Sequence, residues 1–298
     1  MKLDEFLRLN APEDLAALTS AIAATSLVVW ENIPARLGAL TEVNPSGETQ
    51  KAIDVFSNDE FAEAILATGA AAEVASEEMA EVTKGKGKVS VAMDPLDGSS
   101  NVETNNPLGS IFGFYGKPLP TPGRGLLGAA YVTYGNMITL TVTYGKGVHR
   151  FVAKKEGTSL EFELMGIDLK LPPKPEVYAV GGARKDWTPR MRSFVDTLEE
   201  RGLRVRYCGT FVGDYNQVLV RGGMFAYPEL SGRPRGKLRV LYETAPMAFI
   251  NAQAGGYASD GSGNILDIDP EVLAATSPVY IGSEGLVREL QGFLSRPA

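Results

Sequence analysis

The sequence is poor in the two side chains that most often bind transition metals in proteins. Its 298 residues include one cysteine, Cys208, and one histidine, His149. A single cysteine excludes an intramolecular disulfide and a thiolate metal cage. A single histidine excludes every zinc or iron site that needs two imidazoles. We interpret both residues as structural, so any chemistry must rest on carboxylates, hydroxyls, lysine, arginine and backbone groups.

Basic residues and long apolar runs are also scarce. Lysine and arginine total 29 against 36 for aspartate and glutamate, and the net charge of −7 argues against a nucleic-acid-binding surface. The most apolar early segment, 15–30, is interrupted by hydroxyl side chains and is shorter than the roughly 20 residues of a membrane span. The first ten residues carry acids at Asp4 and Glu5 and no long apolar core, so they do not resemble a secretory signal. We therefore expect a cytoplasmic protein that binds neither nucleic acid nor membrane, in which 15–30 is a buried helix.

Hydrophobic periodicity divides the chain into two halves, 1–172 and 173–298. In the first half, spacings of three and four predict helices near the start and over 53–69, and the alanine-rich stretch before Glu77 also looks helical. Runs of β-branched and aromatic residues predict antiparallel hairpins over 111–153. In the second half, strand-like and helix-like segments alternate. We expect a layered α+β or α/β fold in which helix and sheet layers alternate, with one domain in each half.

The strongest chemical signal is the segment from Asp94 to Asn101, which spells Asp-Pro-Leu-Asp-Gly-Ser-Ser-Asn. An apolar strand ends at Asp94, and Pro95 favours a turn with an aspartate at its first position. Such a turn brings the carboxylates of Asp94 and Asp97 to one side. Two carboxylates held at a strand end are hard oxygen ligands. The segment therefore predicts a site for a divalent cation.

A helix start is expected directly after this turn. Ser100 and Glu103 have the spacing of a capping box, which predicts a helix that begins near Ser99. Gly98 lets the backbone bend closely before it, and the N–H groups at a helix start favour an anion. Metal ligands next to an anion cradle indicate metal-assisted phosphate chemistry.

The segment from Asp94 to Asn101 resembles the signature of the fructose-1,6-bisphosphatase family, within the lithium-sensitive, metal-dependent sugar and inositol phosphatases. Other blocks resemble that family in the same order and cover most of residues 44–290. These blocks are Ile53–Asp59, Ser76–Glu78, Gly109–Tyr115, Arg206–Thr210, Gly222–Pro228 and Gly236–Glu243. The resemblance implies the sugar-phosphatase fold, with layers in the order αβαβα.

The resemblance also implies a metal-dependent enzyme with two to three Mg²⁺ ions, or Mn²⁺, in each site. The implied metal ligands are Glu77, Asp94, Asp97, Glu243 and the carbonyl of Leu96. The implied catalytic acids are Glu78, which would help to activate water, and Glu48 and Asp54, which would lie in or after a loop that closes over the metals. Glu48 stands where the family usually has an aspartate.

The implied reaction is hydrolysis of the 1-phosphate of fructose 1,6-bisphosphate to fructose 6-phosphate and phosphate, as in gluconeogenesis. The N–H groups at Gly98, Ser99 and Ser100 would hold the reacting phosphate, and Arg239 would lie near it. The residues implied to hold the second phosphate are Tyr207, Tyr227, Lys237 and Arg206. Because Arg206 would reach across a subunit interface, we expect a homo-oligomer, with a tetramer favoured over a dimer.

Two departures from the family pattern affect these expectations. Gly181 stands where the family usually has an asparagine that contacts the second phosphate. Residues 23–40 do not resemble the family's AMP site, and Gly116 replaces an arginine there, so we expect weak or no inhibition by AMP. Three alternatives remain open: a sedoheptulose-1,7-bisphosphatase or dual enzyme, an inositol monophosphatase, and a non-catalytic regulator that binds a sugar phosphate.

Overall fold

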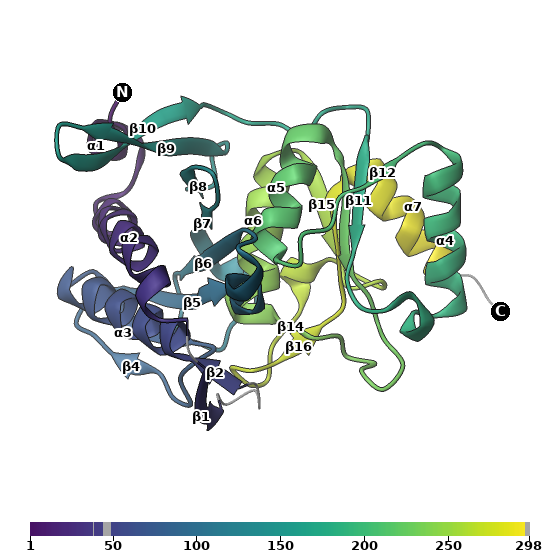
Figure 1. Ribbon diagram of the computed structural model, residues 1–298, viewed down its shortest axis with the longest axis horizontal. Coiled ribbons are helices and arrows are strands. Elements are labelled where there is room, and N and C mark those ends of the chain that lie inside the picture. The colour runs from purple at the N-terminus through teal and green to yellow at the C-terminus, as the bar shows by residue number, and fades with distance from the viewer. Residues whose placement is uncertain (38, 44–48, 296–298) are drawn as a thin grey trace.

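The computed structural model describes residues 1–37, 39–43 and 49–295 (Figure 1). Two large sheets lie face to face, and helices fill the space between them and cover their outer faces. The helices are α1 (Leu3–Asn10), α2 (Glu13–Asn32), α3 (Ala52–Ala67), α4 (Pro189–Glu200), α5 (Phe211–Arg221), α6 (Ala245–Gln253) and α7 (Glu284–Leu294). The resulting order of layers confirms the expected αβαβα arrangement.

The first sheet has eight strands in the order β10-β9-β8-β7-β6-β5-β3-β4. All neighbours are antiparallel except β3 and β5, which run parallel. The strands are β3 (Ala71–Ser76), β4 (Thr83–Lys84), β5 (Val89–Asp97), β6 (Leu108–Tyr115), β7 (Leu126–Tyr134), β8 (Ile138–Thr143), β9 (His149–Glu156) and β10 (Ser159–Gly166). Every residue of β5 and β6 is buried, as expected for strands covered on both faces.

The second sheet has five strands in the order β12-β11-β13-β17-β15. The strands are β11 (Val177–Val180), β12 (Arg204–Val205), β13 (Gly223–Tyr227), β15 (Gly256–Ser259) and β17 (Val279–Ser283). Two small ladders pair β1 (Ala39–Val43) with β2 (Thr49–Lys51) and β14 (Leu238–Arg239) with β16 (Thr276–Ser277). The first sheet therefore lies in the first half of the chain and the second sheet in the second half. The division into two domains at 172/173 stays a prediction.

Six short helical turns connect these elements. They are η1 (Ile33–Ala35), η2 (Ser99–Thr104), η3 (Gly123–Gly125), η4 (Arg184–Asp186), the π-helical turn η5 (Val240–Thr244) and η6 (Ile265–Asp267). Turn η2 follows Asp94 and Asp97, and turn η5 contains Glu243; all three acids are expected metal ligands.

Three hydrophobic clusters fill the spaces between the five layers. The first joins helices α1 to α3 to the eight-stranded sheet around Leu18 and Phe61. The second lies between the two sheets around Tyr215 and Ile250 of α5 and α6. The third packs α4 and α7 on the outer face of the second sheet around Phe194. The middle cluster holds the two halves together, because it takes residues from both sheets.

The segment Glu13–Ala35, which contains α2, is the one described helix long and apolar enough by composition to cross a membrane. Its apolar side packs against the sheet, where Leu18 and Ile22 are fully buried. A helix that covers a sheet needs such an apolar stripe, so the expected helix is confirmed, but it is buried on one side only, because Val28 and Trp30 are exposed.

The structure corrects three local expectations. The alanine-rich stretch before Glu77 is strand β3 and not a helix, because it pairs in parallel with β5 and small side chains fit beneath α3. Strand β10, which was not expected, pairs with β9 at the sheet edge. In the second half, the sequence pattern of 205–208 favours a strand, but strand β12 (Arg204–Val205) ends at Val205.

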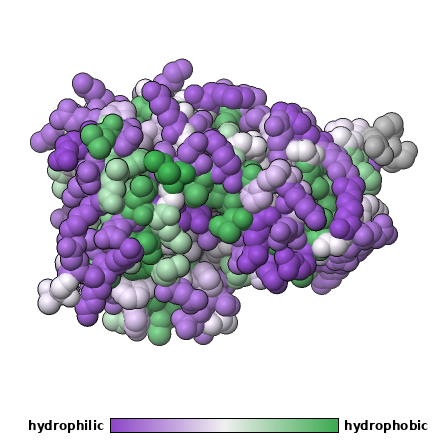
Figure 2. All heavy atoms as spheres, turned by 90° about the horizontal axis from the view of Figure 1, so that it is seen from above, coloured by the Kyte–Doolittle hydropathy of each residue, from purple (hydrophilic) through white to green (hydrophobic). Residues whose placement is uncertain are grey.

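The surface seen from above the view of Figure 1 is mostly hydrophilic (Figure 2). A patch of apolar side chains interrupts it near the middle of that face. The exposed large apolar side chains of the described residues include Trp30, Met165 and Ile167. A monomeric protein exposes single apolar residues as a rule, whereas a contiguous patch is typical of a contact surface.

Candidate active site

Asp94 and Asp97 lie at the carboxyl end of β5, where the strand carries a bulge. The register pairs Asp94 with Ile111 but Asp97 with Gly109, so β5 has one more residue than β6 over this stretch. The expected Asp-Pro turn is therefore a bulge within a strand, a position that tolerates the missing N–H of Pro95. The backbone N–H of Leu96 donates to Asp94 Oδ1 at 3.0 Å and fixes that carboxylate.

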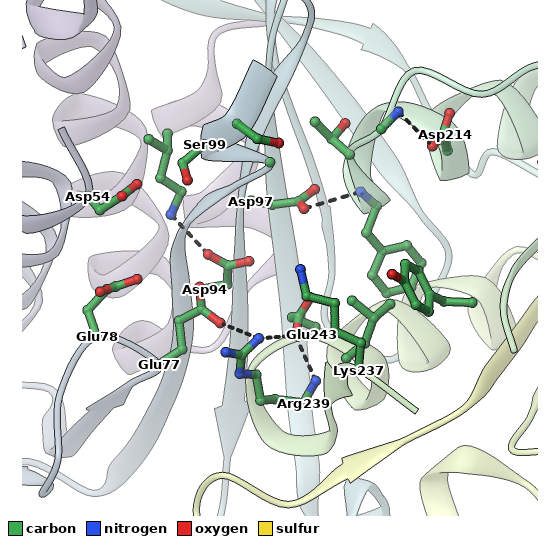
Figure 3. Close-up of a pocket in the computed structure, with 18 of the residues that line it drawn as sticks. Asp54, Glu77, Glu78, Asp94, Asp97, Ser99, Asp214, Lys237, Arg239 and Glu243 are labelled. Carbon is green, nitrogen blue, oxygen red and sulfur yellow. Dashed lines mark hydrogen bonds and ion pairs between the residues drawn. The ribbon is translucent and has the colours of Figure 1, made fainter. Parts of the chain in front are cut away.

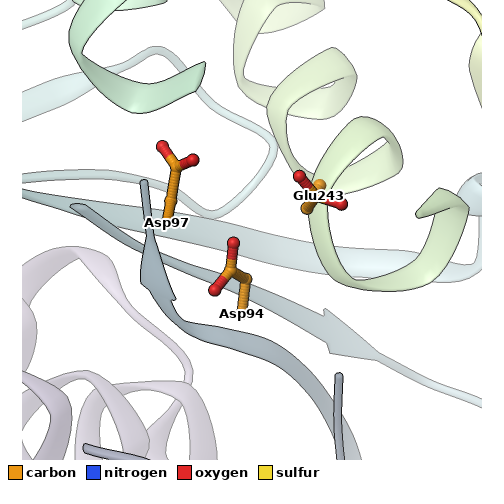
Figure 4. Close-up of side chains that lie close together, drawn as sticks. All are labelled: Asp94, Asp97 and Glu243. Atoms are coloured by element: carbon orange, nitrogen blue, oxygen red, sulfur yellow. The ribbon is translucent and has the colours of Figure 1, made fainter. Parts of the chain in front are cut away.

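Glu243 approaches these two aspartates from the other half of the chain. It lies in the π-helical turn η5, directly before α6. Oxygen atoms of Asp94, Asp97 and Glu243 all lie within 4.8 Å of one another, and all three residues are buried (Figure 4). The expected clustering of these three acids is thus what the structure shows, and a cation between them would meet oxygen ligands from strand β5 and from turn η5.

The electrostatics of this cluster favour a cation. Burial, followed by Glu77 and the neighbouring acids, holds the pKa of Asp94 well above its usual range. Burial raises the pKa of Asp97 to about 6 and that of Glu243 to about 7. These carboxyls therefore lose their protons reluctantly. An all-oxygen, buried set of this kind fits hard divalent cations such as Mg²⁺ or Mn²⁺.

Glu77 and Arg239 add an ion pair to the cluster. Glu77 follows β3 and is brought beside β5 by the parallel pairing of the two strands. Arg239 Nη1 lies 3.3 Å from Glu77 Oε2 and 3.8 Å from Glu243 Oε2, and the backbone N–H of Arg239 donates to Glu243 Oε2 at 2.7 Å (Figure 3). The guanidinium lies against the acids that would bind metal.

In Figure 3, Asp54 and Glu78 lie on the side of the cavity away from Asp214. Asp54 lies in the first turn of α3, where the N–H of Lys51 donates to its Oδ2 at 2.7 Å. Burial, and to a lesser extent Glu78, raises the pKa of Asp54 to about 6. The amide of Gln50 donates to Glu78 Oε2 at 2.5 Å. Glu48, the third expected catalytic acid, lies outside the described residues.

Gly98 marks the point where the chain leaves β5. Its φ of +79° is in the left-handed region, and a Cβ there would lie 2.0 Å from Thr210 Cγ2. The following turn η2 confirms the expected helix start at Ser99, but it is a six-residue 3-10 helix without the expected side-chain cap. The N-cap is Gly98, which has no side chain to accept a hydrogen bond, and the Glu103 carboxylate pairs with Lys51 Nζ at 2.8 Å.

Helix α5 meets Asp97 with its N-terminus. The N–H groups of Phe211 and Val212 donate to the two oxygens of Asp97 at 3.2 and 2.6 Å. The partial positive charge of a helix start stabilises a carboxylate, so this contact favours the ionised form of Asp97. This contact also joins helix α5 of the second half of the chain to strand β5 of the first half.

A cavity of about 180 Å³ lies where these elements meet. The expected site residues that line it are Asp54, Glu77, Glu78, Asp94, Leu96, Asp97, Gly98, Ser99, Ser100, Tyr207, Tyr227, Lys237, Arg239 and Glu243. Of these residues, the acids other than Glu243 come from the first half of the chain, whereas Glu243, Lys237 and the two tyrosines come from the second half. Arg206 is not in this lining; its side chain is exposed.

Several lining residues were not expected from the sequence. They are Gln50, Gly209, Thr210, Phe211, Asp214, Phe225 and Leu238. Thr210 carried a detectable signal, because its hydroxyl accepts from Gly213 N at 2.9 Å as an N-cap of α5. No signal in the sequence indicated Asp214, because its position in the cavity wall depends on how α5 packs between the two sheets.

Gly181, which stands in place of a family asparagine, packs against Tyr227. A Cβ at Gly181 would lie 2.4 Å from Tyr227 Cδ2, so any side chain would displace that ring. Arg184 is the nearest basic residue after Gly181 in the sequence and could replace the asparagine's contact with the second phosphate. It forms an ion pair with Asp196 instead and is not part of the cavity lining.

Comparison with known families agrees with this arrangement. The family model "Fructose-1-6-bisphosphatase, N-terminal domain" matches residues 4–163, and "Fructose-1-6-bisphosphatase, C-terminal domain" matches residues 171–295. The chain belongs to the fructose-1,6-bisphosphatase family. Members of this family are metal-dependent, and the cluster of Asp94, Asp97 and Glu243 could hold a metal ion.

Individual fructose-1,6-bisphosphatases are similar over nearly the whole chain. The class 1 enzyme of Haloarcula marismortui is 37% identical over 282 residues, which cover 95% of each chain. The class 1 enzyme of Citrifermentans bemidjiense is 41% identical and covers 96% of this chain and 89% of its own. Among solved structures, the Leishmania major fructose-1,6-bisphosphatase in holo form has a TM-score of 0.93, with 32% identity and 99% coverage of both chains.

Proposed function

We propose that this chain is a phosphoric monoester hydrolase that removes the 1-phosphate of fructose 1,6-bisphosphate and releases fructose 6-phosphate and phosphate. The observation that carries the proposal is the composition of one cavity. Buried acids, among them Asp94 and Glu243, lie at one end, and Lys237 with two tyrosines lines the same space. A bisphosphate needs both: a metal site for the phosphate that reacts and a cationic site for the phosphate that stays.

The metal-binding part of the proposal assigns Glu77, Asp94, Asp97, Glu243 and the carbonyl of Leu96 as ligands. Divalent cations bound there would polarise the phosphoryl group and supply a water of lowered pKa. We propose Mg²⁺, with Mn²⁺ as a substitute, and two to three ions in each site. The buried all-oxygen donor set supports this choice, because softer metals prefer sulfur or imidazole ligands.

The chain's own residues then bind, orient and exchange protons. Gly98, Ser99 and Ser100 hold the reacting phosphate at the end of β5. Asp54, whose pKa of about 6 suits proton transfer near neutral pH, accepts the proton of the attacking water together with Glu78. The water oxygen forms a bond to phosphorus while the bond between phosphorus and the sugar oxygen breaks, and the sugar oxygen takes up a proton from bulk water.

The remaining residues bind the part of the substrate that does not react. Lys237 supplies positive charge to the second phosphate, and the phenols of Tyr207 and Tyr227 donate hydrogen bonds to it. Arg239 lies near the reacting phosphate. Glu48 belongs to the same proposal as an acid of the closing loop.

A homo-oligomer, preferentially a tetramer, is part of the proposal. The exposed Arg206 lies between two exposed side chains, Val205 and Tyr207, which suits a residue that reaches a neighbouring subunit. The apolar patch of Figure 2 supports a contact surface as well. A cytoplasmic location and weak or absent AMP inhibition stay predictions.

Sedoheptulose 1,7-bisphosphate is the second candidate substrate, alone or together with the first. The observation that favours it is Gly181, which stands where the family usually has an asparagine and packs against Tyr227 of the cavity lining, so the chain lacks one family contact to the second phosphate. A longer sugar places its second phosphate one carbon further from the reacting one.

The test is phosphate release from fructose 1,6-bisphosphate, sedoheptulose 1,7-bisphosphate and inositol 1-phosphate, each with Mg²⁺ and with EDTA. We expect metal-dependent release from the bisphosphates alone, and the ratio of the two kcat/KM values identifies the preferred sugar. Release from inositol 1-phosphate would favour the monophosphatase alternative. No release from any substrate with saturating Mg²⁺ or Mn²⁺ would contradict the proposal and favour a sugar-phosphate-binding regulator.

A further inference from the structure

One wall of the cavity is a segment without regular secondary structure. The backbone from Tyr207 to Thr210 links the short strand β12 to helix α5, and residues 207, 209 and 210 all line the cavity. A wall of this kind takes its position from the side chains that hold its backbone, because no strand ladder or helix fixes it.

Asp214 holds this wall from the α5 side. Its carboxylate accepts hydrogen bonds from two consecutive backbone N–H groups, Cys208 N to Oδ1 at 2.6 Å and Gly209 N to Oδ2 at 3.3 Å. Asp214 is 1% exposed and lies in the first turn of α5, where the helix start stabilises a negative charge. Figure 3 shows its carboxylate on the side of the cavity away from Asp54.

Asn101 holds the same peptide from the side of the first sheet. Its amide donates to the carbonyl of Cys208 at 2.7 Å and to that of Pro107 at 3.1 Å. Both backbone polar groups of Cys208 are therefore bound by side chains, one from α5 and one from η2. The peptide between Tyr207 and Gly209 is fixed from both sides of the cavity.

We propose that Asp214 is a positioning residue that sets the affinity for the second phosphate of the substrate. By holding the N–H groups of Cys208 and Gly209, it fixes the backbone that carries Tyr207 at the end of the cavity lined by Lys237. Asp214 does not touch the substrate, and its action passes through the wall segment. This inference rests on the proposed function, because it assigns the second phosphate to that end.

The test uses the full chain with its metal and two variants. Asp214→Ala removes both acceptors, whereas Asp214→Asn keeps an oxygen for the shorter bond to Cys208 N. The measurements are kcat and KM for fructose 1,6-bisphosphate and the inhibition constants of fructose 6-phosphate and inorganic phosphate. Fructose 6-phosphate carries only the second phosphate, so it reports on that end alone.

For Asp214→Ala we expect KM and the inhibition constant of fructose 6-phosphate to rise together by about tenfold, the loss expected from about one hydrogen bond to a charged group. The kcat should stay within about twofold, because the acids at the other end are unchanged. For Asp214→Asn we expect a rise of about threefold. The matched control is Asp196→Ala on α4, an exposed aspartate that pairs with Arg184 and should change none of these constants.

A fall of kcat with unchanged KM would overturn the proposal, and so would an equal rise of the inhibition constants of fructose 6-phosphate and inorganic phosphate. Circular dichroism and the melting temperature show whether the alanine variant folds; if it does not, the asparagine variant decides by the same criteria. Failure of the proposed function is a separate result, because the unmodified chain would then release no phosphate from fructose 1,6-bisphosphate.

Discussion

Arg239 and Glu77 form an ion pair inside the acidic cavity, with 3.3 Å between Nη1 and Oε2. The Arg239 side chain is 7% exposed and that of Glu77 is 13% exposed, so water screens the pair poorly. The guanidinium compensates part of the negative charge that Asp94, Asp97 and Glu243 concentrate nearby. A divalent cation bound by Glu77 and Glu243 would compensate the same negative charge. The metal ion and the Arg239 guanidinium would then repel each other.

The first prediction concerns this internal cation. Arg239→Met should lower the melting temperature of the metal-free protein by about 5 °C or more, because it leaves buried acids without their compensating charge. It should also enlarge the rise in melting temperature on addition of Mg²⁺. Thermal unfolding of both variants with EDTA and with Mg²⁺ measures this, and Arg235→Met is the control, since Arg235 is exposed. If Mg²⁺ raised the melting temperature of Arg239→Met and of the unmodified protein equally, the prediction would be contradicted.

The second prediction concerns the metal ligands. Asp94→Asn keeps the shape of the side chain but removes its charge, so turnover should fall by at least about 100-fold while the circular dichroism spectrum is retained. The metal-free variant should melt no lower than the unmodified protein, because one repelling charge is gone. Phosphate release and thermal unfolding are the measurements, with Asp269→Asn on the exposed surface as the control. Full activity of Asp94→Asn would exclude Asp94 as a ligand.

The third prediction is the pH dependence of stability without metal. Burial raises the folded-state pKa of Asp97 to about 6 and of Glu243 to about 7, whereas both ionise near pH 4 when unfolded. Between these values the folded protein binds more protons than the unfolded chain, so stability decreases as the pH rises from about 4 to about 7. Bound cations favour the ionised acids and should oppose this loss.

The corresponding measurement is the melting temperature at pH 5.5 and 7.5, with EDTA and with Mg²⁺. We expect the EDTA samples to melt lower at pH 7.5 and the stabilisation by Mg²⁺ to be larger there. If Mg²⁺ stabilised the protein equally at both pH values, these acids would not be its ligands.

The fourth prediction concerns Gly98, where two effects can be separated. Gly98→Ala should destabilise the protein, because φ is +79° and the new Cβ would lie 2.0 Å from Thr210 Cγ2. Gly69→Ala is the matched control: its φ is +72°, but nothing lies within 4 Å of its Cβ position. The backbone strain is thus common to both variants, about 1–2 kcal/mol, and the clash is confined to Gly98.

Thermal unfolding and phosphate release of both alanine variants test this prediction. Gly98→Ala should melt lower than Gly69→Ala and lose activity, since Thr210 caps the helix whose N-terminus holds Asp97. Addition of Thr210→Ser, which removes the clashing methyl group, should recover part of the stability. Equal melting temperatures of the two alanine variants would show that the wall at Thr210 moves easily.

The acids adjacent in sequence were accessible to reasoning from the sequence. Asp94 and Asp97 are three residues apart at the end of an apolar strand, and their spacing alone predicted a shared cation site. The form of that site was not predictable: the segment is a bulge, because β6 pairs with β5 beyond Asp94 and keeps it extended. A local turn preference was overridden by the ladder of hydrogen bonds with a neighbouring strand.

The sequence by itself determined the chemistry of this protein: one cysteine and one histidine left carboxylates as metal ligands, and the motif blocks indicated the family and the layered fold. Tertiary structure alone decided which groups meet. The parallel pairing of β3 with β5 brings Glu77 to Asp94, and the packing of α5 between the sheets brings Asp214 into the cavity wall. Such contacts join residues far apart in the chain, and no local pattern encodes them, because they depend on how whole layers pack.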